Sequence, residues 1–262
     1  MNKQTYSLKL LYSGSDGNAA LFSTDSATIL IDAGRTAKAL TAALSMLAVD
    51  PDSISAIFLT HEHRDHTAAL DVFLKHHKIP VHTTKASAER LRQTAGDALL
   101  ACLVEHPPLF TEQTGALTVT SFETSHDSAC SVGYRLSLAT GDAVHHIGYA
   151  TDLGAVTPAV ERALFGCEAV VIESNHDEEM LMTGPYPYDL KRRIASRHGH
   201  LSNRDCAALC ARLAANGTRR FLLAHLSETN NEPSLALGEV GAALAGTGAH
   251  VAAADPYIIT EL

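Results

Sequence analysis

The chain has 262 residues, of which 46% are hydrophobic, and its formal net charge at pH 7 is −9. A chain of this length and composition can bury a large apolar core, and no Pro/Gly/Ser-rich linker divides it, so the sequence favours one domain spanning residues 1–262. The acidic balance excludes a surface that is basic overall, which nucleic-acid-binding proteins usually display.

The N-terminus and the cysteines bear on the cellular compartment. Residues 1–11 are interrupted by Lys3 and Lys9 and have no long apolar core, which argues against a signal peptide or a membrane span. The five cysteines form no Cys-x-x-Cys pair, and their odd number argues against a disulfide framework. We therefore expect a soluble, cytoplasmic protein that has no membrane partner.

The first predicted strands cover residues 6–12, 19–23 and 28–32. A Gly-containing loop over residues 13–18 joins the first two, and its simplest interpretation is a hairpin turn. The third strand is strongly apolar and ends in Asp32. An Asp in this position can simply cap the helix that is predicted to follow.

The most informative pattern is His-x-His-x-Asp-His, formed by His61, His63, Asp65 and His66. It follows the apolar run of residues 54–59, which is too short and too β-branched for a helix, and it precedes apolar residues at helical spacing. Side chains at i and i+2 of an extended loop project the same way, so the first two His can share one ion while Asp65 and His66 face a second. The alternative is a polar loop rich in His by chance.

Three further residues of metal-binding type follow later predicted strands. They are His126 after residues 117–122, Asp152 after residues 144–149 and His225 after residues 220–224. Each has an ordinary alternative: a polar surface His for the first, an Asp that begins a turn or helix for the second, and a buried core His for the third.

His-x-His-x-Asp-His after a buried strand resembles the signature of the metallo-β-lactamase superfamily. The resemblance implies an α/β (α+β) fold, the four-layer αββα sandwich, and a dinuclear hydrolytic centre. It implies that Asp152 bridges two divalent transition-metal ions, Zn²⁺ or Mn²⁺ with Fe²⁺ also admitted, and that Asp32 supports the ligands from behind. The remaining ligands would be His61, His63 and His126 on one ion, and Asp65, His66 and His225 on the other.

Other segments resemble one branch of that superfamily, the YycJ (WalJ) branch, which is exonuclease-like. The segments are residues 173–180, 184–188 and 199–203, together with the Gly/Ser/Asn loop near the N-terminus. The resemblance implies that Ser15 or Asn18 lines the site. It also makes His176 and His200 candidates to contact phosphate or to protonate a leaving oxygen, although each can equally be a structural His. Further candidate substrate contacts are Asn175, Ser202 and Asn203.

A local basic cluster offsets the acidic balance of the whole chain. It consists of Lys191, Arg192, Arg193, Arg197 and Arg204. A nuclease with a net negative charge must concentrate positive charge near its metals, so we expect this cluster to form one wall of a substrate groove. The alternative is a solvated helix face.

The resemblance thus implies a metal-dependent hydrolase that cleaves phosphodiester bonds, in the manner of an exonuclease acting on DNA or RNA, with Asp65, Asp152, His176 and His200 as catalytic candidates. A small-molecule phosphodiesterase is the main alternative. A thioester or lactone hydrolase and a non-catalytic metal-binding protein are weaker ones. Hydrolysis of β-lactams is a weak interpretation, because the best-known two-zinc β-lactamases carry Cys where this chain has Asp152. The sequence leaves the oligomeric state open.

Overall fold

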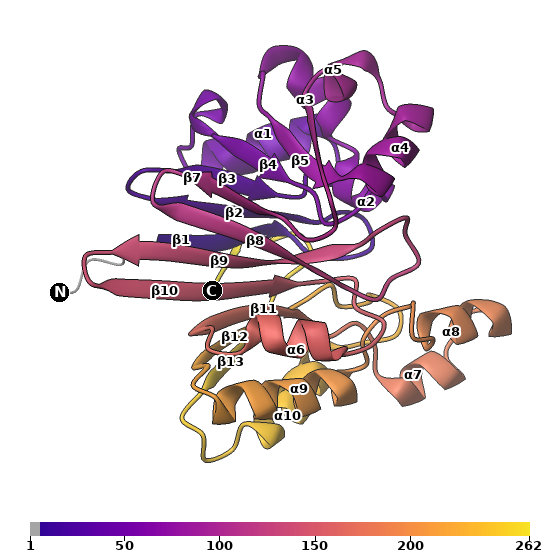
Figure 1. The fold of residues 1–262 in the computed structure, drawn as a ribbon. Helices are drawn as coiled ribbons and strands as arrows, with labels where there is room; N and C mark the ends of the chain where they lie inside the picture. The colour runs from indigo at the N-terminus through magenta and orange to yellow at the C-terminus, as the bar shows by residue number, and fades with distance from the viewer. Residues whose placement is uncertain (1–5) are drawn as a thin grey trace.

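A computed structural model describes residues 6–262. Two seven-stranded sheets face each other, with strand orders β14-β1-β2-β3-β4-β5-β6 and β13-β12-β11-β10-β9-β8-β7. Figure 1 shows helices above the first sheet and below the second, so the chain has the predicted four-layer αββα architecture.

The first sheet contains seven strands from the first half of the chain and the C-terminus. They are β1 Tyr6–Tyr12, β2 Ala19–Thr24, β3 Thr28–Ile31, β4 Ala56–Phe58, β5 Val81–Thr84, β6 Leu103–His106 and β14 Thr260–Glu261. The helices of this half are α1 Ala37–Met46, α2 Arg64–Thr67, α3 Leu70–His76, α4 Lys85–Thr94 and α5 Asp97–Leu100, with a 3-10 turn at Pro51–Ser53. Strands β1 to β3 pair antiparallel, whereas β3 to β6 pair parallel.

The second sheet repeats this arrangement. Its strands are β7 Thr111–Thr114, β8 Leu117–Glu123, β9 Val132–Thr140, β10 Ala143–Ala150, β11 Ala169–Glu173, β12 Arg220–Ala224 and β13 His250–Ala253. The helices are α6 Pro158–Leu164, α7 Glu178–Thr183, α8 Tyr188–Ile194, α9 Asn203–Ala215 and α10 Pro233–Ala243. Strands β7 to β10 pair antiparallel and β10 to β13 pair parallel.

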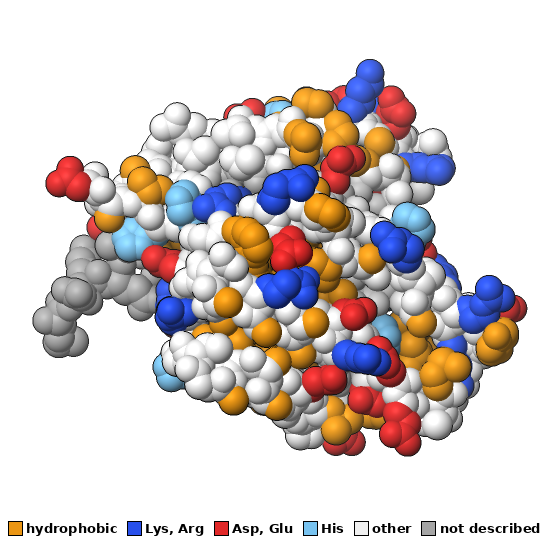
Figure 2. Space-filling view, turned by 60° about the horizontal axis from the view of Figure 1, so that its bottom comes forward, with side chains coloured by type: hydrophobic (Ala, Val, Ile, Leu, Met, Phe, Trp, Pro, Cys, Tyr) orange, Lys and Arg blue, Asp and Glu red, His pale blue; other side chains and the backbone are white. Residues whose placement is uncertain are grey.

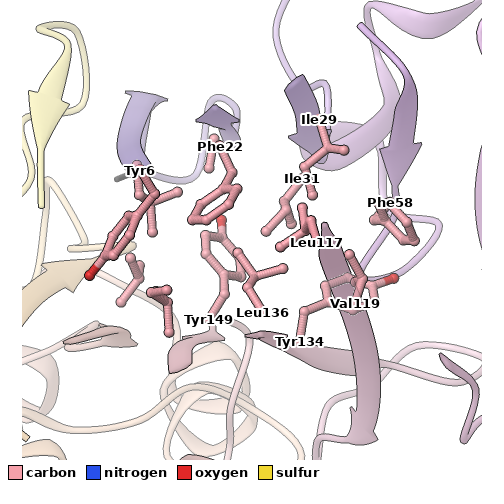
Figure 3. Packing of buried hydrophobic residues seen from close by; sticks show 14 of the residues in the cluster. Tyr6, Phe22, Ile29, Ile31, Phe58, Leu117, Val119, Tyr134, Leu136 and Tyr149 are labelled. Atoms are coloured by element: carbon pink, nitrogen blue, oxygen red, sulfur yellow. The ribbon is translucent and has the colours of Figure 1, made fainter. Parts of the chain in front are cut away.

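The central core lies between the two sheets. Figure 3 shows Phe22 of the first sheet directly above Tyr149 of the second, and the ring centroid of Phe58 lies 5.7 Å from that of Tyr134. Two further apolar clusters fill the outer layers, one beneath α1 and α3 and one beneath α6, α9 and α10. Burying one large apolar side chain stabilises the folded state by about 1.5–3 kcal/mol, so these layers are the main source of stability.

Most element predictions are confirmed, with differences at the ends. The strand predicted over residues 54–59 is only Ala56–Phe58. The apolar residues at helical spacing after the His-x-His-x-Asp-His pattern lie in α3, which is separate from the short helix α2. Ser202, named above as a candidate substrate contact, caps α9 by accepting a hydrogen bond from the Asp205 backbone N–H at 3.2 Å. All five cysteines are free thiols. Across residues 6–262, no helix combines the length and apolarity needed to span a membrane.

Candidate metal centre

The residues of the His-x-His-x-Asp-His pattern and those at later strand ends converge at one end of the sandwich, the end where α2, α7 and α8 lie in Figure 1. Three of the converging residues have a left-handed backbone, with φ of 61° at Asp32, 54° at Asp152 and 57° at His225. Such conformations are uncommon outside glycine and concentrate at functional sites. Here each one turns the chain sharply at the end of a strand and directs a polar side chain inward.

A first group consists of three imidazoles. One ligand nitrogen from each of His61, His63 and His126 lies within 4.8 Å of the others. His61 is fully buried, and its Nδ1 lies 3.0 Å from the Thr60 hydroxyl. His126 Nδ1 lies 3.0 Å from the Gly199 carbonyl oxygen, which accepts its hydrogen bond. With Nδ1 occupied in this way, the Nε2 lone pair of each ring is available to a metal ion.

A second group consists of Asp65, His66 and His225, whose ligand atoms also lie within 4.8 Å of one another. The Oδ2 atom of Asp65 is 3.3 Å from His66 Nε2 and 3.9 Å from His225 Nε2. Burial raises the pKa of Asp65, but His66 and His225 lower it more strongly, so its pKa lies well below the usual range. The carboxylate is therefore ionised at neutral pH, which is the form that binds cations.

Asp152 lies between the two groups. Its Oδ2 is 3.2 Å from His66 Nε2, and its Oδ1 is 3.7 Å from His126 Nε2. The side chain is buried, and burial alone would raise its pKa, but the surrounding imidazoles, with His225 and His66 foremost, hold the pKa well below the usual range. A single carboxylate thus reaches both groups of ligands.

Two buried carboxylates support the imidazoles from behind. Asp32 Oδ2 accepts a hydrogen bond of 2.8 Å from His66 Nδ1, and Asp32 also accepts from the backbone N–H and the hydroxyl of Thr60. Glu173 Oε1 accepts hydrogen bonds of 2.8 Å from both His225 Nδ1 and His200 Nδ1. Burial raises the pKa of Glu173, but His200 and His225 lower it to about 2.

The sequence predicted the place of Asp32 but assigned no role to Glu173. The available signal was the same in both cases: an acidic residue at the end of a short, strongly apolar strand, here Ala169–Glu173. A carboxylate that holds Nδ1–H of an imidazole fixes the ring with Nε2 directed inward.

The chemistry of the cluster fits metal ions. His61 Nε2, His225 Nε2 and Asp152 Oδ2 are buried and have no hydrogen-bond partner within residues 6–262. Buried polar atoms are rarely left in this state, because an unsatisfied group costs about 1–3 kcal/mol. Neutral imidazole nitrogens and carboxylate oxygens are ligands of Zn²⁺, Mn²⁺ and Fe²⁺. The cluster can therefore bind metal.

His200 and His176 occupy different positions relative to this cluster. The His200 ring centroid lies 5.1 Å from that of His126 and 5.2 Å from that of His225, and its side chain is partly accessible. Burial lowers the pKa of His200, but Glu173 raises it above the usual value. His176 and Ser202 line a cavity of about 260 Å³ that His200 also lines, and His176 is not among the residues that line the centre itself. His176 Nδ1 is buried without a hydrogen-bond partner in the described chain.

The predicted substrate contacts are spread around the centre. Ser15, Asn175 and Arg193 line a cavity of about 200 Å³ that His200 also borders. Asn18 is buried, donates to the Gly14 carbonyl oxygen and lies 3.2 Å from His66 Nε2. Asn203 is buried too, accepts a hydrogen bond from the Ser174 hydroxyl and lines neither this cavity nor the one that His176 lines.

The predicted basic cluster is divided in the structure. Arg193 donates to Asp127, which lines the centre, and Arg192 lies over the ring of Tyr188 on the same helix. Lys191 donates to the Met182 carbonyl oxygen, and Arg204 faces Glu178, 3.8 Å away. Figure 2 shows Lys and Arg side chains interspersed with Asp and Glu on the face that it presents, not a continuous basic surface.

The chain is similar to proteins of known family. Residues 27–226 match the family model of the Beta-lactamase superfamily domain. The chain is 34% identical to the exodeoxyribonuclease YycJ of Bacillus anthracis, covering 97% of each chain, and 30% identical to the exodeoxyribonuclease WalJ of Streptococcus pneumoniae, covering 90% of this chain and 87% of that one.

Solved structures share the fold at lower sequence identity. The metallo-beta-lactamase fold protein YhfI of Bacillus subtilis superposes with a TM-score of 0.73 at 16% identity, covering 98% of this chain and 100% of that one. Zn²⁺-bound PqqB of Methylobacterium extorquens gives 0.74 at 16% identity over the same shares. By fold, by sequence and by the ligand-type residues at its strand ends, the chain belongs to the beta-lactamase superfamily, in the family of YycJ and WalJ.

Proposed function

We propose that this protein is a metal-dependent phosphodiester hydrolase that acts as an exodeoxyribonuclease. The observation that carries the proposal is the position of Asp152, a buried carboxylate within 3.2 Å of one ligand group and 3.7 Å of the other. The identity to YycJ and WalJ, both named exodeoxyribonucleases, supports a nucleic-acid substrate.

The proposed centre holds two ions. His61, His63 and His126 would hold one, Asp65, His66 and His225 the other, and Asp152 would bind both, with Zn²⁺ or Mn²⁺ as the ions and Fe²⁺ also admitted by the ligand set. Two such ions, when bound, make water acidic enough to attack near neutral pH and stabilise charge on the attacking and leaving oxygens.

His200 is the proposed proton donor to the leaving oxygen. Glu173 holds its Nδ1 at 2.8 Å and raises its pKa, so the protonated imidazole is favoured beside the centre. Its partial exposure and its place between two cavities give a substrate access to the ring. A general acid in this position contributes about 10²–10⁴-fold to a rate. His176, which lines the second cavity but not the centre, would contact phosphate rather than the reacting oxygen.

Substrate binding is proposed for the cavity wall formed by Ser15, Asn175 and Arg193, with Arg192 and Arg197 extending it outward. Arg193 is the strongest candidate, because its side chain is 64% exposed while its Nε holds Asp127 at the rim of the centre. A guanidinium fixed in this way retains donors for a phosphate oxygen. Lys191, Ser202 and Asn203 would act mainly by holding the wall in shape.

A second candidate function is hydrolysis of small or cyclic phosphodiesters. The cavity beside the centre is about 200 Å³ and includes Tyr186, Leu190 and Ile194, which suits a single nucleoside better than a duplex. An exonuclease and a small diesterase both need such a pocket. The two functions differ in whether the enzyme also acts on a substrate with a long phosphate backbone, such as DNA.

The test is a panel of end-labelled single-stranded and double-stranded DNA, RNA, cyclic nucleotides and bis(p-nitrophenyl) phosphate, each assayed with Zn²⁺ and with Mn²⁺. We expect stepwise shortening of DNA, abolished in Asp152→Ala and His63→Ala, with metal content measured on the same samples. Hydrolysis of cyclic or chromogenic diesters without shortening of DNA would select the second candidate. Full activity in both variants would show that the proposed centre is not the catalytic site.

A further inference from the structure

A second group of ligand-type side chains lies away from the candidate metal centre, at the edge where β6 and β7 lie. His82 is on β5, His106 is the last residue of β6, and Glu112 is on β7. Strand β6 is the edge of the first sheet and β7 is the edge of the second. One ligand atom from each residue lies within 4.8 Å of the other two.

The spacing of these atoms is close to that of a metal site. His82 Nδ1 is 2.9 Å from His106 Nε2, and His106 Nδ1 is 3.7 Å from Glu112 Oε1. Around a tetrahedral zinc ion with bonds of about 2.0–2.2 Å, neighbouring ligand atoms are roughly 3.3 Å apart. The two measured distances involve different nitrogens of His106, which gives only one of them to an ion. The ligand set is therefore one nitrogen of each imidazole and one carboxylate oxygen, and these three atoms lie within 4.8 Å of one another.

Aromatic neighbours hold both imidazoles in place. The ring of Phe58 stacks on His82 with centroids 4.7 Å apart, and Phe110 stacks on His106 at 4.1 Å. The planes of the two imidazoles are only 7° apart. Rings restrained in this way lose little further freedom when they bind an ion. Burial lowers the pKa of both His82 and His106, which favours the neutral, metal-binding form at pH 7.

We propose that His82, His106 and Glu112 form a peripheral site for a divalent ion of the Zn²⁺ class. Two imidazoles and one carboxylate are a common zinc ligand set, with a fourth position open to solvent. An ion here would join β5 and β6 of the first sheet to β7 of the second, beside the connection of residues 107–110. Because such an ion binds the folded chain and not the unfolded one, it stabilises the edge of the sandwich.

The test counts bound ions in the full chain, independently of any catalytic activity. Equilibrium dialysis against graded free Zn²⁺, followed by elemental analysis, should find one more ion per chain in the wild type than in His106→Gln at the same free concentration. Glu112→Gln should weaken that ion at least tenfold. His145→Gln is the matched control, since His145 also lies on a strand and pairs with Glu168 at 3.0 Å, and it should bind as many ions as the wild type.

Thermal unfolding gives a second readout. Excess Zn²⁺ should raise the Tm of Asp152→Ala, in which the main centre is disrupted, and should raise it less in Asp152→Ala combined with Glu112→Gln. Equal ion counts in the wild type, His106→Gln and Glu112→Gln would overturn the proposal. If His106→Gln does not fold, the comparison with Glu112→Gln decides alone, since Glu112 is partly exposed and its replacement disturbs no core packing.

Discussion

Glu173 Oε1 accepts a hydrogen bond of 2.8 Å from Nδ1 of His200, a residue that comes from a different loop and faces the candidate metal centre. The same oxygen accepts from His225 at 2.8 Å, so one buried carboxylate orients both a proposed ligand and the proposed proton donor. Oε2 of Glu173 is fixed in turn by the Leu153 backbone N–H at 2.6 Å.

Glu173→Gln should therefore lower turnover about 10–100-fold, the usual effect of losing a carboxylate behind metal ligands. The change replaces a charged acceptor by an amide that cannot favour the protonated His200. The pH profile of turnover should move, because the pKa of His200 is no longer raised. A matched control is Glu168→Gln, just before the opposite end of β11, which should leave turnover unchanged. A Glu173→Gln enzyme with wild-type kcat and an unmoved profile would contradict the assigned role.

Metal removal should lower stability without unfolding the chain. Because the large apolar clusters lie between the sheets and beneath the helices, chelation should leave the far-UV circular dichroism at 25 °C unchanged. The Tm should nevertheless fall by several degrees, since ions at 1,000 times their Kd contribute about 4 kcal/mol to the folded state. Calorimetry before and after chelation and re-addition measures the change in Tm. Outright unfolding on chelation would show that the ions carry the fold itself.

Reversing Arg192 and Arg193 to Glu should weaken binding of single-stranded DNA and reduce the dependence of log K on log salt by roughly 0.7 for each phosphate that is no longer neutralised. Hydrolysis of a small chromogenic diester should change far less, because that substrate has no extended backbone. Arg204→Glu is the matched control, as Arg204 faces Glu178 at 3.8 Å and lines neither the 200 Å³ cavity nor the candidate metal centre. Fluorescence anisotropy at several salt concentrations is the measurement. An unchanged affinity and slope would leave these residues as a solvated helix face.

A pH-dependent contribution to stability should come from Glu168, far from the centre. Tyr6 donates to Glu168 Oε1 at 2.6 Å, and His145 Nδ1 lies 3.0 Å from Oε2. Burial raises the pKa of Glu168, but these hydrogen bonds lower it more, so the folded pKa lies below its ordinary value. A depressed carboxyl pKa contributes stability above the unfolded-state pKa, near about 4.3, which is lost as pH falls through the folded pKa.

Glu168→Gln should accordingly cost about 1 kcal/mol at pH 7, a value reduced for solvent screening because the side chain is 41% exposed. The difference from the wild type should shrink below about pH 4. Urea unfolding across about pH 3.5 to 7, with chelator present in every sample, separates this effect from metal binding. A difference that is constant with pH would show that the effect comes from packing and not from charge.

The sequence predicts the centre better than its surroundings, and the reason is physical. His126 follows a strand that alternates between buried and partly exposed residues, and His225 follows a strongly apolar one, so the end of each strand can be located from the chain alone. The position of Glu173 at a strand end could be predicted in the same way. Its role could not, because that depends on which imidazoles lie opposite it in the folded chain. Edge strands β6 and β7 were not predicted, because their residues are at best partly buried and both strands carry charge. The contact between His82 and His106 depends on strand register, which periodicity does not specify.

The division of α2 from α3 was likewise beyond the local pattern. The Ala69 N–H donates to the Ala33 carbonyl oxygen, and the Ala33 N–H donates to the His66 carbonyl oxygen. The break between α2 and α3 is therefore held by the segment that follows β3, more than thirty residues earlier in the chain. A helix propensity summed over one segment contains no information about such a partner.

The left-handed corners have a consequence for how this centre can change over evolutionary time. At Asp152 and His225 the backbone itself restricts the side chain, since a positive φ is tolerated best by Gly, Asn, Asp and His and poorly by β-branched residues. His63 has an ordinary extended backbone with φ of −60° and imposes no such restriction. A descendant that acquires a new metal preference by exchanging one ligand should therefore do so more readily at position 63. At positions 152 and 225 the backbone conformation limits which residue types are tolerated.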